Sequence, residues 1–294
     1  MLTNSPFASA LSSEASRHEI ALDTIEASAD KRAVTAAVGA RLARGDFEVL
    51  VVDTFPAGLA GELPPILPTL DATKALVHRD IDPAYARARD FPALFDAYDR
   101  ILAPGERGPQ ADRAILTAPW LVRDCHELWP AERARQAFEP ERGAGPVVVV
   151  SATGKDPEIA ALLELSEALG AALRGVATVR ASTLASGFPL LERMRGIDVL
   201  VGAGGYNTVW EARQTQTPFV GLPWPRLYDR QALRLSDDER AEGLRDVIER
   251  VRARLPRAEP AGAARVISYR NGVHEAVSVV GLRDDTARGP RARS

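Results

Sequence analysis

The sequence predicts an α/β protein built from parallel strands, and three observations favour this class. Apolar runs of strand length alternate with segments of helical period along most of the chain. These runs are rich in valine and leucine without polar alternation, so helices should cover both faces of each sheet. The length of 294 residues, at about 150 residues per domain, indicates two such domains.

Seven strands are expected, each a short run that begins or ends at a charged or turn residue. The longest purely apolar run is Val147–Val150, whereas a membrane-spanning helix requires about 20 residues, so we expect no integral membrane segment. In order, the expected strands are Glu48–Asp53, Lys74–Arg79, Asp99–Ala103, Pro146–Ser151, Val176–Arg180, Asp198–Val201 and Pro218–Leu222.

Three longer helices are expected between or after these strands. The segment Glu26–Arg44 carries an apolar face and should end at Gly45, a residue typical of the position after a helix. A second helix should begin with Asp156 as its N-cap, followed by proline and a first-turn acid, and end at Gly170. A third is expected over about Arg240–Leu255.

The periodicity weakens between the third and fourth expected strands, and we place a linker there. The predicted division is an N-terminal domain over 1–122, a linker over 123–145, a C-terminal domain over 146–282 and a disordered tail over 283–294. The tail is basic and contains glycine and proline.

Composition excludes several classes of function. Thirty-seven basic and forty acidic residues give a net charge of −3, which disfavours a nucleic-acid partner. A single cysteine, Cys125, and four histidines cannot assemble a Cys/His metal site, so no metal is expected. The chain shows no basic, apolar leader, and with one cysteine this predicts a cytoplasmic protein.

The most informative segment runs from the strand Asp198–Val201 through a glycine loop into a helix. Glycines let a phosphate approach the backbone, and the helix start presents free N–H groups and the positive end of its dipole. Glu211, further along the helix, can accept hydrogen bonds from a ribose. The residues expected at this site are Gly204, Gly205, Tyr206, Asn207, Thr208 and Glu211.

Two other interpretations of this loop remain. A dinucleotide fingerprint is disfavoured because Asn207 occupies the place of the third glycine and no acid follows at the expected distance. The second alternative is a tight strand-to-helix turn that binds no ligand.

The next segment follows a strand end, where open α/β sheets bind ligands. Here the sequence resembles the C-terminal domain of GT-B glycosyltransferases, in the bacterial group of the peptidoglycan N-acetylglucosaminyltransferase and family 28-like predicted glycosyltransferases. The resemblance implies that the glycine loop holds the donor diphosphate, Glu211 the ribose, and the Asp/Gln pair the sugar hydroxyls. The shared elements are the loop Gly204–Thr208, Glu211–Ala212, the strand from Pro218, Pro223, and Asp229, Arg230 and Gln231.

Weaker similarity extends to three other segments. Thr153 and Gly154 lie where the family has a phosphate-facing turn, although a plain capping turn explains them equally well. Val52–Gly58 resembles the family's DTFP segment, and Leu2–Phe7 the end of its second strand. The N-terminal domain would then lack its first βα unit, either because the protein is a shortened relative or because its start codon is misassigned. The uncovered sheet predicts dimers or poor solubility.

The expected activity is transfer of a sugar from a nucleotide-sugar donor to an unknown acceptor, without a cofactor. The resemblance implies uridine diphosphate (UDP) as the donor carrier. Asp53, at the end of a predicted strand, is the candidate general base, although carboxylates at strand ends are commonly turn or N-cap residues. The alternatives are a non-catalytic nucleotide-sugar-binding protein, partnered as a homodimer or with a second subunit, and a hydrolase of the same donor.

Overall fold

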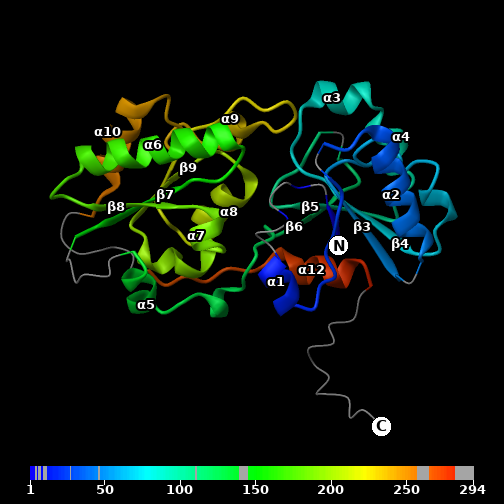
Figure 1. The fold of residues 1–294 in the computed structure, drawn as a ribbon, viewed down its shortest axis with the longest axis horizontal. Coiled ribbons are helices and arrows are strands. Elements are labelled where there is room, and N and C mark those ends of the chain that lie inside the picture. The colour runs from blue at the N-terminus through cyan, green and yellow to red at the C-terminus, as the bar shows by residue number, and fades with distance from the viewer. Residues whose placement is uncertain are drawn as a thin grey trace, which may run out of the picture. The chain divides into compact units, whose positions relative to one another are not determined.

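The computed structural model describes residues 1–281 except positions 4, 6, 7, 9–11, 27, 46, 110, 139–144 and 257–264. The chain divides into two units, one of Met1–Ala118 with the segment from Val273 onward, the other of Pro119–Gly272. Each unit contains a four-stranded parallel sheet with helices packed against it (Figure 1). The expectation of an α/β protein with two Rossmann-like units is therefore confirmed.

The second unit is built around one sheet with the order β10-β9-β7-β8, and all its neighbouring strands are parallel. The strands are β7 (Val147–Ser151), β8 (Thr178–Ser182), β9 (Val199–Gly202) and β10 (Phe219–Gly221). The helices are α5 (Ala131–Gln136), α6 (Asp156–Ala172), α7 (Leu184–Gly187), α8 (Tyr206–Gln214), α9 (Gln231–Arg234) and α10 (Leu244–Arg254), with 3-10 turns η3 (Cys125–Glu127) and η4 (Leu190–Gly196).

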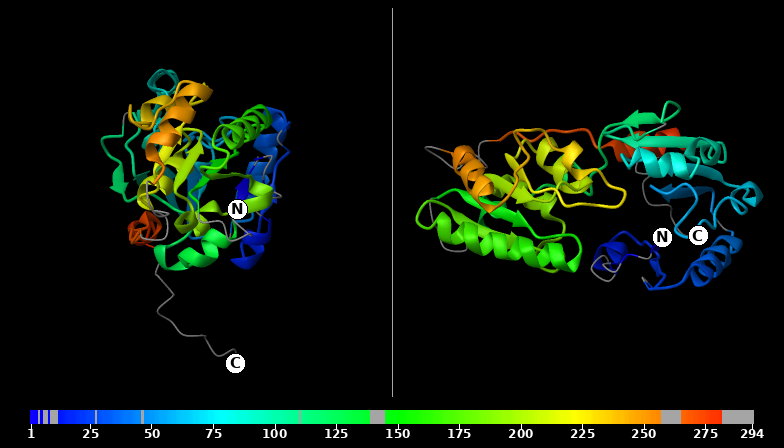
Figure 2. Two further views of the ribbon diagram at one scale, coloured as in Figure 1. Left: turned by 90° about the vertical axis from the view of Figure 1, so that its left-hand side faces the viewer. Right: turned by 90° about the horizontal axis from the view of Figure 1, so that it is seen from above.

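Helices cover both faces of this sheet, as the unbroken valine run of β7 requires. Val148 and Val150 pack on one side with residues of α6 and α10. Val147 and Val149 pack on the other side with α8 and η4. Both clusters are fully apolar, and α6 lies along the sheet in every view (Figure 1, Figure 2). The sheet is therefore buried on both faces, and only its strand ends and edges reach solvent.

The first unit holds a sheet with the order β3-β4-β5-β6 and a separate two-stranded sheet, β1-β2. The strands are β1 (Leu2–Thr3), β2 (Asp23–Thr24), β3 (Val49–Asp53), β4 (Thr73–Val77), β5 (Arg100–Pro104) and β6 (Ile115–Thr117). The helices are α1 (Ser12–Arg17), α2 (Lys31–Ala43), α3 (Pro83–Ala88), α4 (Phe91–Phe95) and α12 (Gly272–Val279), with the 3-10 turn η2 (Leu67–Thr69).

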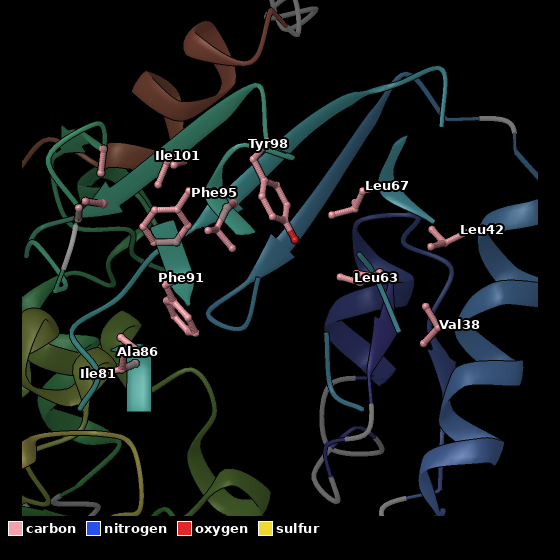
Figure 3. Packing of buried hydrophobic residues seen from close by; sticks show 14 of the residues in the cluster. Val38, Leu42, Leu63, Leu67, Ile81, Ala86, Phe91, Phe95, Tyr98 and Ile101 are labelled. Atoms are coloured by element: carbon pink, nitrogen blue, oxygen red, sulfur yellow. The ribbon is translucent and has the colours of Figure 1, made fainter. Parts of the chain in front are cut away.

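The core of the first unit combines an aliphatic and an aromatic part (Figure 3). Val38 and Leu42 point from α2 toward Leu63 in the segment after β3. In the aromatic part, the Tyr98 hydroxyl donates a hydrogen bond of 2.6 Å to the carbonyl of Pro56. This bond satisfies a buried hydroxyl and fixes the chain that leaves β3.

The last described helix, α12, packs with the first unit and not with the unit that precedes it in sequence. The Glu275 carboxylate accepts a hydrogen bond from the N–H of Ala118 at 3.1 Å, and Arg100 donates to the carbonyl of Val279 at 3.3 Å. The chain therefore crosses between the units twice. The two crossing segments are joined by a hydrogen bond of 3.0 Å from the N–H of Gly272 to the carbonyl of Pro119. The sequence placed 146–282 in one domain, because nothing local marks this return.

The expected strands agree with the structure to within about two residues, the usual uncertainty of element boundaries, while the helix ends differ more. Helix α2 begins five residues later than expected, after Asp30, whose carboxylate accepts from the N–H of Ala33. Helix α6 has Lys155 as its N-cap and continues through Gly170. Gly170 therefore lies inside the helix and does not end it. A Cβ added at Gly170 would lie 3.9 Å from the Cβ of Val179 in β8.

Some segments were not anticipated, and one prediction lies outside the structure. Strand β6 (Ile115–Thr117) was missed because it is only three residues long, shorter than each expected strand. The expected linker 123–145 contains η3 and α5. The tail 283–294 lies outside the described residues. No helix in the described ranges has the length and apolarity that a membrane crossing needs, and no three metal-binding side chains cluster there.

Candidate functional site

The carboxyl ends of β7 and β9 lie side by side in the second unit, and the chain leaves them toward opposite faces of the sheet. From β7 it enters α6 on one face, and from β9 it enters α8 on the other. Open α/β sheets bind ligands at such switch points. The two loops that flank it are the glycine loop Gly202–Gly205 and the turn Ala152–Lys155.

The start of α8 presents unused hydrogen-bond donors at this edge. The first bond inside the helix runs from the N–H of Val209 to the carbonyl of Gly205, at 3.1 Å. Within the described part of the chain, the N–H groups of Gly205, Asn207 and Thr208 take part in no hydrogen bond. The first turn also carries no acidic side chain. The positive end of the helix dipole is therefore open to an anion.

The two adjacent glycines of the loop have different structural roles. A Cβ added at Gly204 would lie 2.8 Å from the carbonyl oxygen of Gln231, so this glycine is required by close packing. A Cβ added at Gly205 would meet nothing within 4 Å. The absence of a side chain at Gly205 therefore leaves open space directly before α8.

The side chains in the first turn of α8 have different roles. Tyr206 is buried, and its hydroxyl accepts a hydrogen bond of 3.0 Å from the N–H of Trp120, so its ring fixes the helix to the preceding chain. The methyl group of Thr208 covers the end of β9: it would lie 3.2 Å from a Cβ added at Gly202. Of these three side chains, only that of Asn207 is exposed.

The start of α6, on the other side of the switch point, is already occupied by its own acid. The Glu158 carboxylate accepts from the N–H of Lys155 at 2.9 Å and from the Arg226 guanidinium at 2.6 Å. Gly154 has φ +131°, and a Cβ there would clash with this carboxylate. Thr153 is half-buried in the same turn. This geometry fits the capping-turn interpretation of Thr153 and Gly154 and directs an incoming anion toward α8.

Glu211 lies on α8 about 7.5 Å further along the helix axis than Tyr206, at 1.5 Å per residue. Its side chain is half-buried and makes no hydrogen bond or ion pair within the described part of the chain. Burial raises the pKa of this carboxyl group from 4.5 to about 8. Burying a carboxyl group without a partner is unfavourable, which is typical of a ligand site.

The segment Asp229–Gln231 lies against the glycine loop, but internal contacts engage two of its side chains. Gln231 is buried, and its side-chain oxygen accepts from the N–H of Trp224 at 3.0 Å. Asp229 accepts from Arg234 at 2.8 Å. Between them in sequence, Arg230 is half-buried and is likewise engaged by other residues. Asp229 and Gln231 thus shape the loop whether or not they contact a ligand.

Asp53 belongs to the first unit, at the carboxyl end of β3. Its carboxylate is 62% exposed and forms an ion pair of 3.2 Å with Arg79, which follows β4. The hydroxyl of Thr54 also donates to it at 3.0 Å. Because the carboxylate is exposed, Asp53 is accessible to a reactant. An exposed ion pair of this kind contributes little to stability.

Sequence reasoning missed two arginines that hold the loops in place. Arg226 joins the loop after β10 to the turn after β7 through Glu158. Arg234 is buried and donates to the carbonyl of Gly204 at 2.8 Å as well as to Asp229. Each lies within five residues of Asp229, which is the only signal that could have found them.

Comparison with solved structures identifies the fold. A crystal structure described as the glycotransferase of kitacinnamycin aligns with a TM-score of 0.54 and 15% identity, over 86% of this chain and 83% of that chain. The spinosyn rhamnosyltransferase SpnG, complexed with thymidine diphosphate, aligns over 73% of this chain and 71% of that chain, with a TM-score of 0.45 and 19% identity. No family model and no curated protein matches the sequence. The first alignment shows the two-domain GT-B fold.

The two glycines yield opposite predictions. Gly205→Val should keep the fold, because its Cβ enters open space, but should remove anion and nucleotide binding. Gly204→Ala should lower the melting temperature, because its Cβ would meet the backbone of Gln231. Thermal unfolding and calorimetry with a nucleoside diphosphate measure both effects. A Gly205→Val variant that binds normally would exclude the start of α8 as the anion site.

The raised pKa of Glu211 predicts that the stability of the protein depends on pH. Its pKa is higher in the folded chain, about 8, than in the unfolded chain, so its proton stabilises the fold below about pH 4.5 and this contribution is lost as the pH rises through about 8. As the pH rises through about 8, the free energy of unfolding of the wild type should fall, relative to that of the neutral Glu211→Gln variant, by at least about 1.4 kcal/mol, the equivalent of one pKa unit. Urea titrations at several pH values test this; parallel curves for the two proteins would contradict it.

Proposed function

We propose that this protein transfers a sugar from a nucleoside diphosphate sugar, with UDP as the carrier, to a hydroxyl acceptor. The observation that carries the proposal is the pairing of two features on α8. Free N–H groups at Gly205, Asn207 and Thr208 suit a diphosphate, and the unpartnered Glu211 carboxyl group suits the ribose hydroxyls. The GT-B fold and the sequence resemblance to family 28-like glycosyltransferases support this interpretation.

The reaction follows from where charge develops. An acceptor oxygen attacks the anomeric carbon of the sugar, the bond from that carbon to the diphosphate breaks, and the diphosphate leaves with an added negative charge. The N–H groups and dipole of α8 stabilise that charge, as fixed donors do at other reacting centres. Asp53 is proposed as the base that takes the acceptor proton, on the strength of its exposure at a strand end.

Glu211 is the residue whose change separates this proposal from a plain strand-to-helix turn. Glu211→Ala should weaken binding of the preferred nucleotide about 10- to 150-fold, which corresponds to about 1.5 to 3 kcal/mol. Glu211→Gln should lie between, because it keeps the shape and loses the charge. Titration calorimetry with uridine, guanosine and thymidine diphosphates measures these affinities.

The matched control is Glu164→Ala, which removes an exposed glutamate of α6 and should leave the affinity unchanged. A further readout is proton release: burial raises the pKa of Glu211 to about 8, and ribose hydroxyls that donate to its carboxylate favour the ionised form. Binding enthalpies in buffers of different ionisation enthalpy should therefore show proton release on binding to the wild type and none from this group in Glu211→Gln. Equal affinity of wild type and Glu211→Ala, with unchanged circular dichroism, would remove Glu211 from the site.

Asp53→Asn tests the base. The turnover rate should fall about 10²- to 10⁴-fold, because an amide cannot take a proton, while nucleotide affinity stays unchanged. Asp71→Asn, an exposed acid in the same unit, is the control. Release of UDP from a UDP-sugar, with a panel of alcohol acceptors and with water alone, measures turnover. Release in water alone supports the hydrolase alternative, and binding without any release supports the non-catalytic one.

A further inference from the structure

The loop after β3, Phe55–Gly61, lines a cavity of about 50 Å³ in the first unit. The other lining residues are Lys31 of α2, Tyr85 of α3, Arg89 after α3 and Phe91 of α4. Phe91 belongs to the aromatic part of the core (Figure 3), so the cavity lies directly against packed side chains. We refer to this space as the loop pocket. The DTFP segment of the sequence runs into this loop, and the proposed reaction gives its phenylalanine and proline no role.

The loop has a fixed, turned conformation. Gly58 and Gly61 have φ values of +84° and +86°, in the left-handed region that favours glycine. The N–H of Gly58 donates to the carbonyl of Phe55 at 2.9 Å. The buried Tyr98 hydroxyl holds the carbonyl of Pro56 at 2.6 Å. Groups on this loop therefore need little rearrangement to meet a ligand.

Two backbone N–H groups of the loop are unused. The Glu62 carboxylate accepts from the N–H groups of Leu59 and Ala60, at 3.2 and 2.7 Å. Those of Ala57 and Gly61 take part in no hydrogen bond within the described part of the chain. Both residues line the loop pocket. Unused N–H groups in turns bind anions, so these two can donate to a negatively charged ligand.

Two cationic side chains and no acidic one line the pocket. Lys31 and Arg89 form no ion pair with the residues that the structure describes. The Arg89 guanidinium carbon lies 5.7 Å from the centre of the Tyr85 ring, which places this cation beside an aromatic wall. The lining therefore carries two positive charges that the protein itself does not neutralise.

Four carboxylates are close to these residues in sequence, and none of them lines the pocket. Glu62 is buried and engaged by the loop's own N–H groups. Asp30 and Asp82 cap α2 and α3 by accepting from the first N–H groups of those helices. Asp90, next to Arg89, is exposed. The pocket thus keeps its positive charge although acids surround it.

The size and charge of the pocket match a phosphate group. A cavity needs about 10 to 15 Å³ on this scale to hold one water, so about 50 Å³ holds roughly three to five atoms of that size. A phosphate monoester presents one phosphorus and three terminal oxygens there, and its charge at neutral pH is about −1.5 to −2. A carboxylate has one charge and two oxygens, which leaves one cation of the lining without a partner.

We propose that the loop pocket binds the phosphate group of a small molecule, a phosphate monoester or inorganic phosphate. The planar guanidinium of Arg89 suits two phosphate oxygens, and the Lys31 ammonium suits the third. Half-buried Phe55 and Tyr85, with Leu59 50% exposed beside them, favour an ester that has an apolar body. This inference does not depend on the nucleotide site, which belongs to the other unit.

The probes are phenyl phosphate and inorganic phosphate, with benzyl alcohol as the uncharged comparison, each added to the full-length protein. NMR spectra should show saturable shifts of the Ala57 and Gly61 amide protons with phenyl phosphate, because these protons gain an anionic acceptor. The amide protons of Leu59 and Ala60, which already donate to Glu62, should shift less. These resonances report on the loop alone, whatever binds at α8.

The three compounds distinguish the source of the phosphate. Tighter binding of phenyl phosphate than of inorganic phosphate assigns the pocket to an ester, and equal binding assigns it to the free ion. Benzyl alcohol should leave the Ala57 and Gly61 resonances unchanged. If benzyl alcohol shifts them as strongly as phenyl phosphate does, the pocket recognises an apolar group and the proposal is wrong.

Lys31→Gln and Arg89→Gln should each weaken phenyl phosphate binding at least about tenfold, because each removes a charged partner of the phosphate. The matched controls are Arg32→Gln and Arg87→Gln, which change exposed arginines of α2 and α3 outside the pocket and should leave the affinity unchanged. UDP affinity should be the same in all four variants, which separates this test from that of the nucleotide site. Equal phenyl phosphate affinities of the pocket variants and their controls would overturn the proposal, and so would the absence of saturable shifts with both phosphate compounds.

Discussion

The close approach of the glycine loop to α9 is the constraint on which the candidate site depends. Gly204 lies so near the backbone of Gln231 that no side chain fits, and the buried Arg234 ties its carbonyl to Asp229. These contacts hold the chain where it leaves β9 and so fix the direction in which α8 begins. The free N–H groups are therefore preorganised and need no rearrangement to meet an anion.

The first turns of α6 and α8, at the switch point, differ in charge and therefore in role. Helix α6 neutralises its own dipole with Glu158, and that acid also anchors the loop after β10 through Arg226. Helix α8 has no acid in its first turn and keeps its donors unused. One start thus stabilises the scaffold while the other remains available. Of the two helices, only α8 has a half-buried carboxyl group that makes no hydrogen bond or ion pair with the residues that the structure describes.

The sequence predicted those parts of the molecule whose signal is local. The valine run of β7 is a strong signal because both faces are buried, and the glycine loop was placed correctly between β9 and α8. The partners of individual side chains were beyond reach, even where they lie close in sequence. Nothing in the spacing of Asp229 and Gln231 reveals that Arg234 and Trp224 engage them, and the isolation of Glu211 depends on residues that are distant in sequence. The return of α12 to the first unit has no local signal for the same reason.

That return has a topological consequence. Because the chain passes from one unit to the other at Pro119 and again at Gly272, two covalent connections join the units. The hydrogen bond between these residues joins the two connections, so the chain enters and leaves the second unit at one place. The second unit is thereby an insertion within the first, and the first is completed only by residues that follow the whole of the second.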